Sequence, residues 1–262
     1  MRALAREWHA AGATIGLVPT MGALHAGHMS LVTAARAETP RVVVSVFVNP
    51  LQFGAGEDFE RYPRPVEADL AMLREAGVDA VYMPDQSALY PPDASTRVRV
   101  GGVAETLEGV ATVVTKLLWA TQADRAYFGQ KDAQQAAVVK RLAADLDSGV
   151  EIRVCPTIRD ADGLAVSSRN AYLRPAERTA ALSLTRSLRV AAEMYASGER
   201  DTGRLRVRIH EVLAAEPLLR LDYAELVNAA TFQPPGTLAV IAVRIGKTRL
   251  IDNHDVSKPF PG

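Results

Sequence analysis

Two of the five histidines in this chain, His25 and His28, stand three residues apart in the segment 19–28. An apolar run at 14–18 predicts a strand before them, and the pattern over 27–37 predicts a helix that begins at them. The free N–H groups and partial positive charge of a helix N-terminus favour a bound phosphate. Two imidazoles on one face beside it would stabilise charge that develops on a phosphoryl group. The alternative is a pair of surface histidines without a ligand.

Two further segments carry polar residues where a predicted strand ends. The segment 49–53 follows an almost continuously apolar stretch, and the amide of Gln52 can bind a hydroxyl or a carboxylate. The segment 128–135 leads from a short strand into a helix. It holds Lys131, a mobile cation suited to phosphate, and Gln135 lies one turn into the helix. Each segment alone could also be an ordinary polar loop.

A fourth segment, 164–170, contains two hydroxyls and a guanidinium in succession, Ser167, Ser168 and Arg169. These groups could clamp a triphosphate, and a polar linker is the alternative. Ligands of parallel sheets bind beyond the carboxyl ends of the strands. Four polar segments at such positions therefore favour an enzyme that uses a nucleotide.

The elements that must position these segments alternate over the first two-thirds of the chain. Strands are expected at 14–18, 42–48, 78–83, 125–128 and 151–158, and helices at 3–11, 27–37, 65–76, 104–121 and 132–146. This alternation predicts a doubly wound parallel α/β sheet. After about Arg169 the order changes to two helices, at 175–197 and 201–215, followed by strands at 222–227, 237–245 and 249–252. We therefore expect two domains, 1–168 and 169–262, the second a smaller α+β domain.

Composition narrows the class of protein. The chain has 262 residues, of which 48% are hydrophobic and 23% charged, as in ordinary globular proteins. Lys plus Arg and Asp plus Glu balance at 30 each, so the chain as a whole offers no attraction to nucleic acid or to a membrane surface. Its apolar stretches are far shorter than a membrane span. The single cysteine, Cys155, fits a reducing compartment, and we expect a cytoplasmic protein.

Six segments together resemble one enzyme family. They are Val18–His28, Ser45–Phe53, Tyr62–Arg64, Phe128–Gln135, Asp162–Asn170 and Arg249–Asn253. A chain that carries all six segments resembles the pantoate–β-alanine ligases. These enzymes belong to the nucleotidyltransferases related to class I aminoacyl-tRNA synthetases. His25-Ala26-Gly27-His28 matches the HxGH nucleotide motif of that group, and Ser167-Ser168-Arg169 occupies the place of its mobile KMSKS-type loop.

The resemblance implies a Rossmann-like domain over 1–168 that binds ATP and pantoate, and a small lid domain over 169–262. It implies ATP contacts at Met21, Gly22, Ala23, Leu24, His25, Ala26, Gly27, His28, Gly129, Gln130, Lys131, Asp132, Ile158, Val166, Ser167, Ser168 and Arg169. It implies substrate contacts at Gln52, Gln135, Thr20 and Asn49, and catalytic roles for His28, His25, Lys131 and Arg169. It also implies Mg²⁺ with ATP, the small-molecule substrates ATP, pantoate and β-alanine, and a homodimer.

In the family reaction, the carboxylate of (R)-pantoate attacks the α-phosphorus of ATP and gives pantoyl adenylate and pyrophosphate. The amine of β-alanine then attacks the acyl carbonyl, which yields pantothenate and AMP. Two other functions remain open from the residues alone. One is an adenylyltransferase that makes a dinucleotide-type product, and the other is a nucleotide-binding regulatory module.

This sequence departs from the family in two places. The family has an RPxHFxG-like stretch of around ten residues after its LEG segment, whereas here Leu107-Glu108-Gly109 runs straight into Val110. The second departure is Gln130, where the family commonly has Glu. Metal ligands are not evident, although Asp69 lies in a region that is sometimes implicated.

Overall fold

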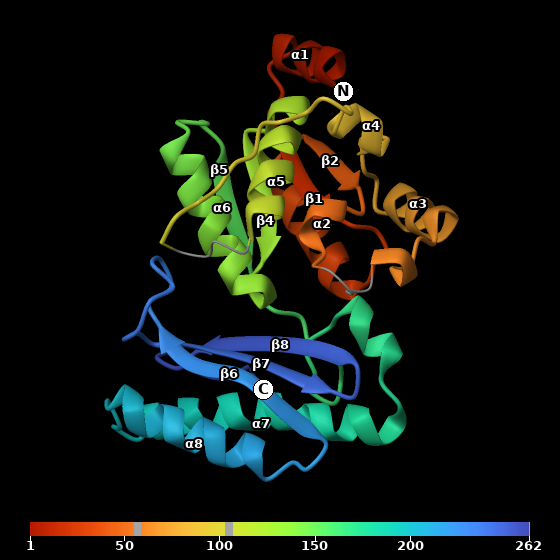
Figure 1. Cartoon of the computed structure of the whole chain (residues 1–262). Coiled ribbons are helices and arrows are strands. Elements are labelled where there is room, and N and C mark those ends of the chain that lie inside the picture. The colour runs from red at the N-terminus through yellow and green to blue at the C-terminus, as the bar shows by residue number, and fades with distance from the viewer. Residues whose placement is uncertain (55–58, 103–106, 262) are drawn as a thin grey trace. The chain divides into compact units, whose positions relative to one another are not determined.

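The computed structural model describes residues 1–54, 59–102 and 107–261. Figure 1 shows the order of its helices and strands. The chain forms two compact units. The first comprises Met1–Gly129 and Gln134–Cys155, and the second comprises Gln130–Ala133 and Pro156–Gly262.

The first unit contains a parallel sheet in the order β3-β2-β1-β4-β5. Its strands are β1 (Ile15–Thr20), β2 (Arg41–Val46), β3 (Ala80–Tyr82), β4 (Arg125–Gly129) and β5 (Glu151–Cys155). The apolar run in β2 is explained by burial on both faces, since Val42, Val43 and Val44 are all inaccessible to solvent. The predicted parallel α/β sheet is confirmed.

Helices cover both faces of this sheet. They are α1 (Arg2–Ala10), α2 (Ala26–Glu38), α3 (Val66–Glu75), α4 (Gln86–Leu89), α5 (Glu108–Thr121) and α6 (Ala133–Asp145), with short 3₁₀ turns η1 (Pro50–Gln52) and η2 (Phe59–Arg61). On one face, Leu17 and Val43 pack in a core with residues of α5 and α6. On the other, Val18 and Val44 pack with residues of α2 and α3. Because strand side chains alternate between faces, each strand contributes to both cores.

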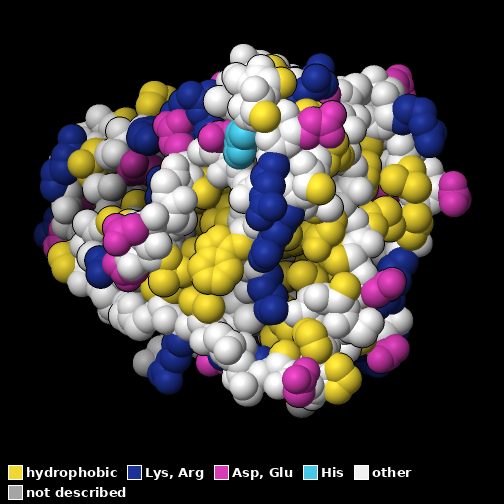
Figure 2. Space-filling view, turned by 90° about the horizontal axis from the view of Figure 1, so that it is seen from above, with side chains coloured by type: hydrophobic (Ala, Val, Ile, Leu, Met, Phe, Trp, Pro, Cys, Tyr) yellow, Lys and Arg dark blue, Asp and Glu magenta, His cyan; other side chains and the backbone are white. Residues whose placement is uncertain are grey.

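Charged side chains of both signs share the surface. On the face seen in Figure 2, a short row of basic side chains runs between apolar ones, and acidic side chains lie around it. This mixture accords with the equal totals of 30 basic and 30 acidic residues.

The second unit is a small α+β fold. It contains the 3₁₀ turns η4 (Gln130–Asp132) and η5 (Ser168–Tyr172), the helices α7 (Pro175–Ala196) and α8 (Thr202–Ala214), and the strands β6 (Leu219–Val227), β7 (Leu238–Ile245) and β8 (Thr248–Asp255). The strands form an antiparallel sheet in the order β6-β7-β8. Its core includes Leu184 and Leu188 of α7, Leu205 and Ile209 of α8, and Ile241 of β7. The predicted α+β architecture of this region is confirmed.

Several boundaries differ from the sequence-based expectation. The strand expected at 151–158 ends at Cys155, and Asp132 lies in the turn η4 that precedes α6. Of the helix expected at 104–121, residues 104–106 lie outside the described residues. In the part of the chain that is described, we find no helix with both the length and the apolar character needed to cross a membrane.

The expected division after Ser168 also differs from the grouping in the structure, which assigns Pro156 onward to the second unit. The reason lies in contacts made by the intervening residues. The guanidinium of Arg159 donates to both carboxylate oxygens of Asp252, at 2.7 and 3.0 Å, and Leu164 is buried in the core of the second unit. Both contacts join residues far apart in the sequence, so local composition does not reveal them.

The start of α5 packs closely against η1. A Cβ atom added to Gly109 would lie 1.9 Å from the backbone oxygen of Leu51. The backbone oxygen of Gly109 also accepts a hydrogen bond of 3.0 Å from the side-chain amide of Asn49. Gly109 therefore permits the helix to begin in direct contact with the turn that carries Gln52.

We expect Gly109→Ala to lower the free energy of unfolding by about 1–3 kcal/mol, because the methyl group forces backbone atoms apart. Urea unfolding followed by circular dichroism measures the change. Gly101→Ala is the matched control, since no atom of the described residues, its two chain neighbours aside, lies within 4 Å of its added Cβ. Equal stability of the Gly109 and Gly101 variants would contradict the close contact.

Candidate active site

The residues expected to form the site are divided between the two units. The first unit holds Thr20, Met21, Gly22, Ala23, Leu24, His25, Ala26, Gly27, His28, Asn49, Gln52, Gly129 and Gln135. The second holds Gln130, Lys131, Asp132, Ile158, Val166, Ser167, Ser168 and Arg169. Each group is described within its own unit.

In the first unit, the strand order reverses between β1 and β4. Thr20 is the last residue of β1 and Gly129 the last of β4, and the two strands are parallel. In open α/β sheets the crevice at such a reversal, beyond the carboxyl ends of the strands, is where ligands bind. The histidine-bearing segment that follows β1 therefore begins at the edge of the sheet where folds of this kind bind ligands.

The loop after β1 is held by a buried carboxylate. Asp69 of α3 is only 3% exposed, and its two oxygens accept hydrogen bonds from the backbone N–H groups of Ala23 (2.9 Å) and Leu24 (2.8 Å). Gly22 and Ala23 both have positive φ, at 77° and 50°, and a Cβ on Gly22 would lie 2.9 Å from Asp69 Oδ2. A sharply bent backbone thus wraps around one carboxylate.

Sequence reasoning missed this role of Asp69. The available signal was its spacing, since Asp69 stands one helical turn before Leu73 and both are buried on the same side of α3. Buried carboxylates are retained where hydrogen bonds satisfy them. Thr20, expected to contact substrate, also serves this loop: its hydroxyl donates to the backbone oxygen of Ser45 and accepts from the N–H of Gly22.

The two histidines lie side by side. His25 is the N-cap of α2 and has an extended backbone, and its carbonyl oxygen accepts from the N–H of His28 at 2.9 Å. Their rings are stacked, with centroids 4.0 Å apart and planes inclined by 26°. A Cβ on Gly27 would lie 3.0 Å from the His25 ring, so the glycine between them makes room for the stack. The arrangement presents two imidazoles at the N-terminus of one helix, as their spacing predicts.

Gln52 is held by a network that begins at a tyrosine. The hydroxyl of Tyr90 donates to Asn49 Oδ1 at 2.9 Å, and Asn49 Nδ2 donates to Gln52 Oε1 at 2.9 Å. Burial raises the pKa of Tyr90 to about 12, so its hydroxyl remains a donor at neutral pH. Asn49, expected to contact substrate, is fully buried and occupied by these contacts. Gln52 Oε1 is engaged, and its Nε2 group is the donor that it can offer to an oxygen atom of a ligand.

In the second unit, the expected nucleotide contacts lie on two segments. Lys131 lies in η4, and its Nζ is 3.7 Å from Asp132 Oδ1. The second segment folds back on itself: the N–H of Val166 donates to the backbone oxygen of Ile158 at 2.9 Å, and Arg159 and Ala165 form an antiparallel bridge. Ser167 caps η5, its hydroxyl accepting from the N–H of Arg169 at 3.3 Å. Ile158 and Val166 are thus held beside each other.

Among the described residues, no group of three or more His, Cys, Asp or Glu side chains could hold a metal ion. Asp69, which lies in the region considered for metal binding, already uses both oxygens on backbone amides. The hydrogen bonds of Asp69 therefore shape the loop after β1.

Comparison with known proteins agrees with the resemblance of the motifs. A family model described as pantoate-beta-alanine ligase matches residues 1–255. The pantothenate synthetase of Rubrobacter xylanophilus is 51% identical over 275 aligned positions, covering 97% of this chain and 94% of that protein. The pantothenate synthetase of Gluconobacter oxydans is 53% identical and covers 92% of each chain.

Two solved structures are similar in fold as well as in sequence. Pantothenate synthetase from Thermus thermophilus superimposes with a TM-score of 0.91 at 44% identity, covering 97% of this chain and 98% of that one. Pantoate-beta-alanine ligase from Francisella tularensis, complexed with beta-gamma ATP and beta-alanine, has a TM-score of 0.78 at 31% identity, covering 98% and 97%. The match extends over both units, and the chain belongs to the pantoate–β-alanine ligase family.

Proposed function

We propose that this chain condenses (R)-pantoate with β-alanine at the expense of ATP, giving pantothenate, AMP and pyrophosphate through a pantoyl adenylate. The observation that carries the proposal is the family match over residues 1–255, which includes the histidine pair at the N-terminus of α2. The function and the class of enzyme follow from that membership. The residue roles below are the part that requires experiment.

The first step joins two anions, because a carboxylate attacks a phosphate. Groups that donate hydrogen bonds or carry positive charge lower the barrier when they are already aimed at the phosphoryl oxygens. We assign this role to His25, His28, Lys131 and Arg169. The stacked rings of His25 and His28 and the adjacent N-terminus of α2 form one such set of donors.

Pantoate requires groups that recognise its hydroxyls and carboxylate. We assign this to Gln52 and Gln135, both half-buried. Because Asn49 holds Gln52 Oε1, the Nε2 donor of Gln52 suits an acceptor oxygen of the acid. In the second step the amine of β-alanine attacks the acyl carbonyl, and the bond to AMP breaks. In this assignment Gln52 stays bound to the acyl group and so serves both steps.

We further propose that Mg²⁺ arrives bound to ATP. Mg²⁺ keeps several water ligands and is commonly held by substrate phosphates with few protein carboxylates. A cytoplasmic location accords with the single cysteine, Cys155, since reducing compartments are where unpaired thiols persist.

We expect His28→Ala and Lys131→Ala each to reduce adenylate formation about 10²–10³-fold, the scale of losing one well-placed donor to developing charge. Formation of labelled pantoyl adenylate in a single turnover measures the effect. His9→Ala and Lys140→Ala are matched controls, because both side chains are exposed and lie outside the assigned site. Near-normal rates in His28→Ala or Lys131→Ala would remove that residue from the mechanism.

If adenylate formation precedes amide formation, labelled pyrophosphate exchanges into ATP with pantoate present and β-alanine absent. Gln52→Ala should lower the rate of pantoate-dependent exchange about tenfold or more, because a polar group of pantoate then loses its hydrogen-bond partner. Most of the ATP binding should remain. Gln86→Ala, an exposed glutamine on α4, is the control. Exchange that strictly requires β-alanine would exclude this order. Exchange without pantoate would indicate an adenylyltransferase acting on another acceptor.

We also propose that the chain forms a homodimer, as the family resemblance implies. Closed two-fold dimers are the commonest assemblies of soluble oligomeric proteins. Multi-angle light scattering at micromolar concentration should give twice the chain mass of 28.2 kDa. A mass equal to that of one chain at this concentration would refute the dimer.

A further inference from the structure

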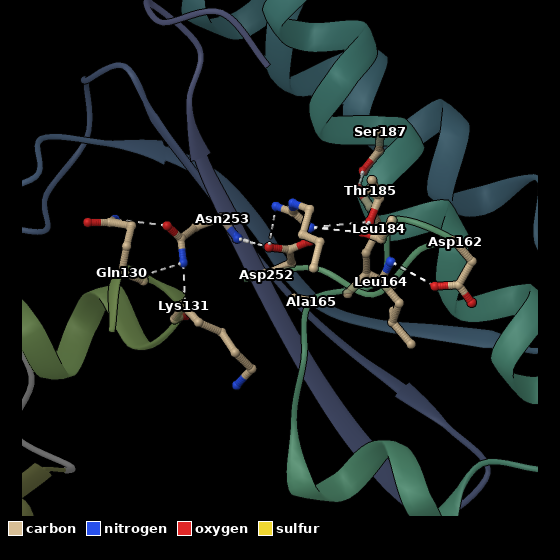
Figure 3. A network of polar contacts seen from close by, with 12 residues as sticks. Gln130, Lys131, Asp162, Leu164, Ala165, Leu184, Thr185, Ser187, Asp252 and Asn253 are labelled. Atoms are coloured by element: carbon tan, nitrogen blue, oxygen red, sulfur yellow. Dashed lines mark hydrogen bonds and ion pairs between the residues drawn. The ribbon is translucent and has the colours of Figure 1, made fainter. Parts of the chain in front are cut away.

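Both polar atoms of the Asn253 side-chain amide on β8 bond to the turn that carries Lys131. Asn253 Nδ2 donates to the backbone oxygens of Gln130 and Lys131, both at 2.9 Å, and its Oδ1 accepts from Gln130 Nε2 at 2.9 Å. Figure 3 shows this amide set between the strand and the turn. Asn253 is 4% exposed, so water does not compete for these bonds.

The neighbouring residue anchors the other nucleotide segment of this unit. Asp252 receives the bidentate pair from Arg159, and its Oδ1 also accepts from the N–H of Asn253 at 2.8 Å. Arg159 directly follows Ile158. Consecutive side chains of a strand point to opposite sides, so one residue pair can serve two segments. Adjacent positions on β8 therefore fix both the turn at Lys131 and the segment that begins at Ile158.

Two backbone oxygens fix which end of the Asn253 amide faces the turn, because carbonyl oxygens only accept hydrogen bonds. The Nδ2 group of Asn253 therefore faces these two oxygens, and Gln130 Nε2 donates to the Oδ1 atom on the other end of the amide. This gives the glutamine a defined role at a position where the sequence departs from its family. At Lys131 the amide bonds only to the backbone, and the lysine side chain extends away from it (Figure 3).

We propose that Asn253 is a positioning residue for Lys131 that fixes the backbone from which the lysine extends. The inference rests on the proposed function, in which Lys131 contacts the transferring phosphates. A lysine is a point charge on a flexible stem, so its reach is set by where its backbone is held. A displacement of about 1 Å at a reacting centre can lower a rate by as much as 10²-fold. In this proposal Asn253 acts through Lys131 and not directly on the substrate.

A double-mutant cycle tests the proposal, with pantoate-dependent pyrophosphate exchange as the readout. Asn253→Ala should lower kcat/KM for ATP by about 10–100-fold and leave the KM for pantoate within about twofold. In a Lys131→Ala background the same substitution should cost less than about threefold, since the group that Asn253 positions is already gone. Asn228→Ala is the matched control, because Asn228 is exposed and its side chain bonds within its own turn.

Each outcome has a separate meaning. No pantoate-dependent exchange by the unmodified chain would overturn the proposed function. Normal exchange by Lys131→Ala would overturn the role of the lysine, and with it this inference. If both behave as expected but the losses from Asn253→Ala and Lys131→Ala multiply, Asn253 acts independently of Lys131 and only the positioning proposal fails.

Melting curves show whether Asn253→Ala folds. If it does not, Asn253→Ser replaces it in the cycle, because its hydroxyl can still donate to one of the two carbonyl oxygens. The expected loss is then smaller, and the criterion is unchanged: the loss must shrink when Lys131 is absent. An equal loss in both backgrounds overturns the proposal.

Discussion

The parallel pairing of β1 with β2 on one side and β4 on the other is the constraint on which the first unit depends. Parallel strands bring their carboxyl ends to one edge, and each return to that edge requires a helix across a face of the sheet. Because helices cover both faces of the sheet, the central strands must be apolar on both faces. Polar residues that could take part in chemistry therefore lie in the segments after the strand ends. The chemistry of the first unit is concentrated after strand ends because the buried strands themselves cannot expose it.

Buried carboxylate and amide side chains hold segments of the backbone in place in both units. Asp69 closes the loop before α2, and Asp252 with Asn253 holds two segments in the second unit. Burying such groups is costly unless hydrogen bonds satisfy them, and here the bonds go to main-chain groups, to the guanidinium of Arg159 and to the side-chain amide of Gln130. These hydrogen bonds therefore fix the backbone of the segments that carry the histidine pair and Lys131.

The arrangement of elements could be predicted because apolar stretches and helical periodicity are local properties. The histidine pair could be predicted for the same reason, since its geometry follows from a spacing of three residues. The contacts of Asp69 and Asn253 could not, because their partners lie 46 and 123 residues away in the sequence. The division between the units likewise depends on Arg159 and Asp252, a pair that no local pattern reveals. The assigned roles of the site residues remain predictions.

The membership of residues 130–133 in the second unit has a consequence for how the chain can be divided. Ala133 packs in a small apolar cluster with Val227, Leu238 and Val240, and the Asn253 amide finds its partners in that short segment. A fragment that begins at Pro156 contains the helices α7 and α8 and all three strands of the second unit, yet it lacks these four residues. The two units are therefore interleaved in the chain. Neither unit is one continuous segment, so no single truncation or recombination event could isolate a complete unit.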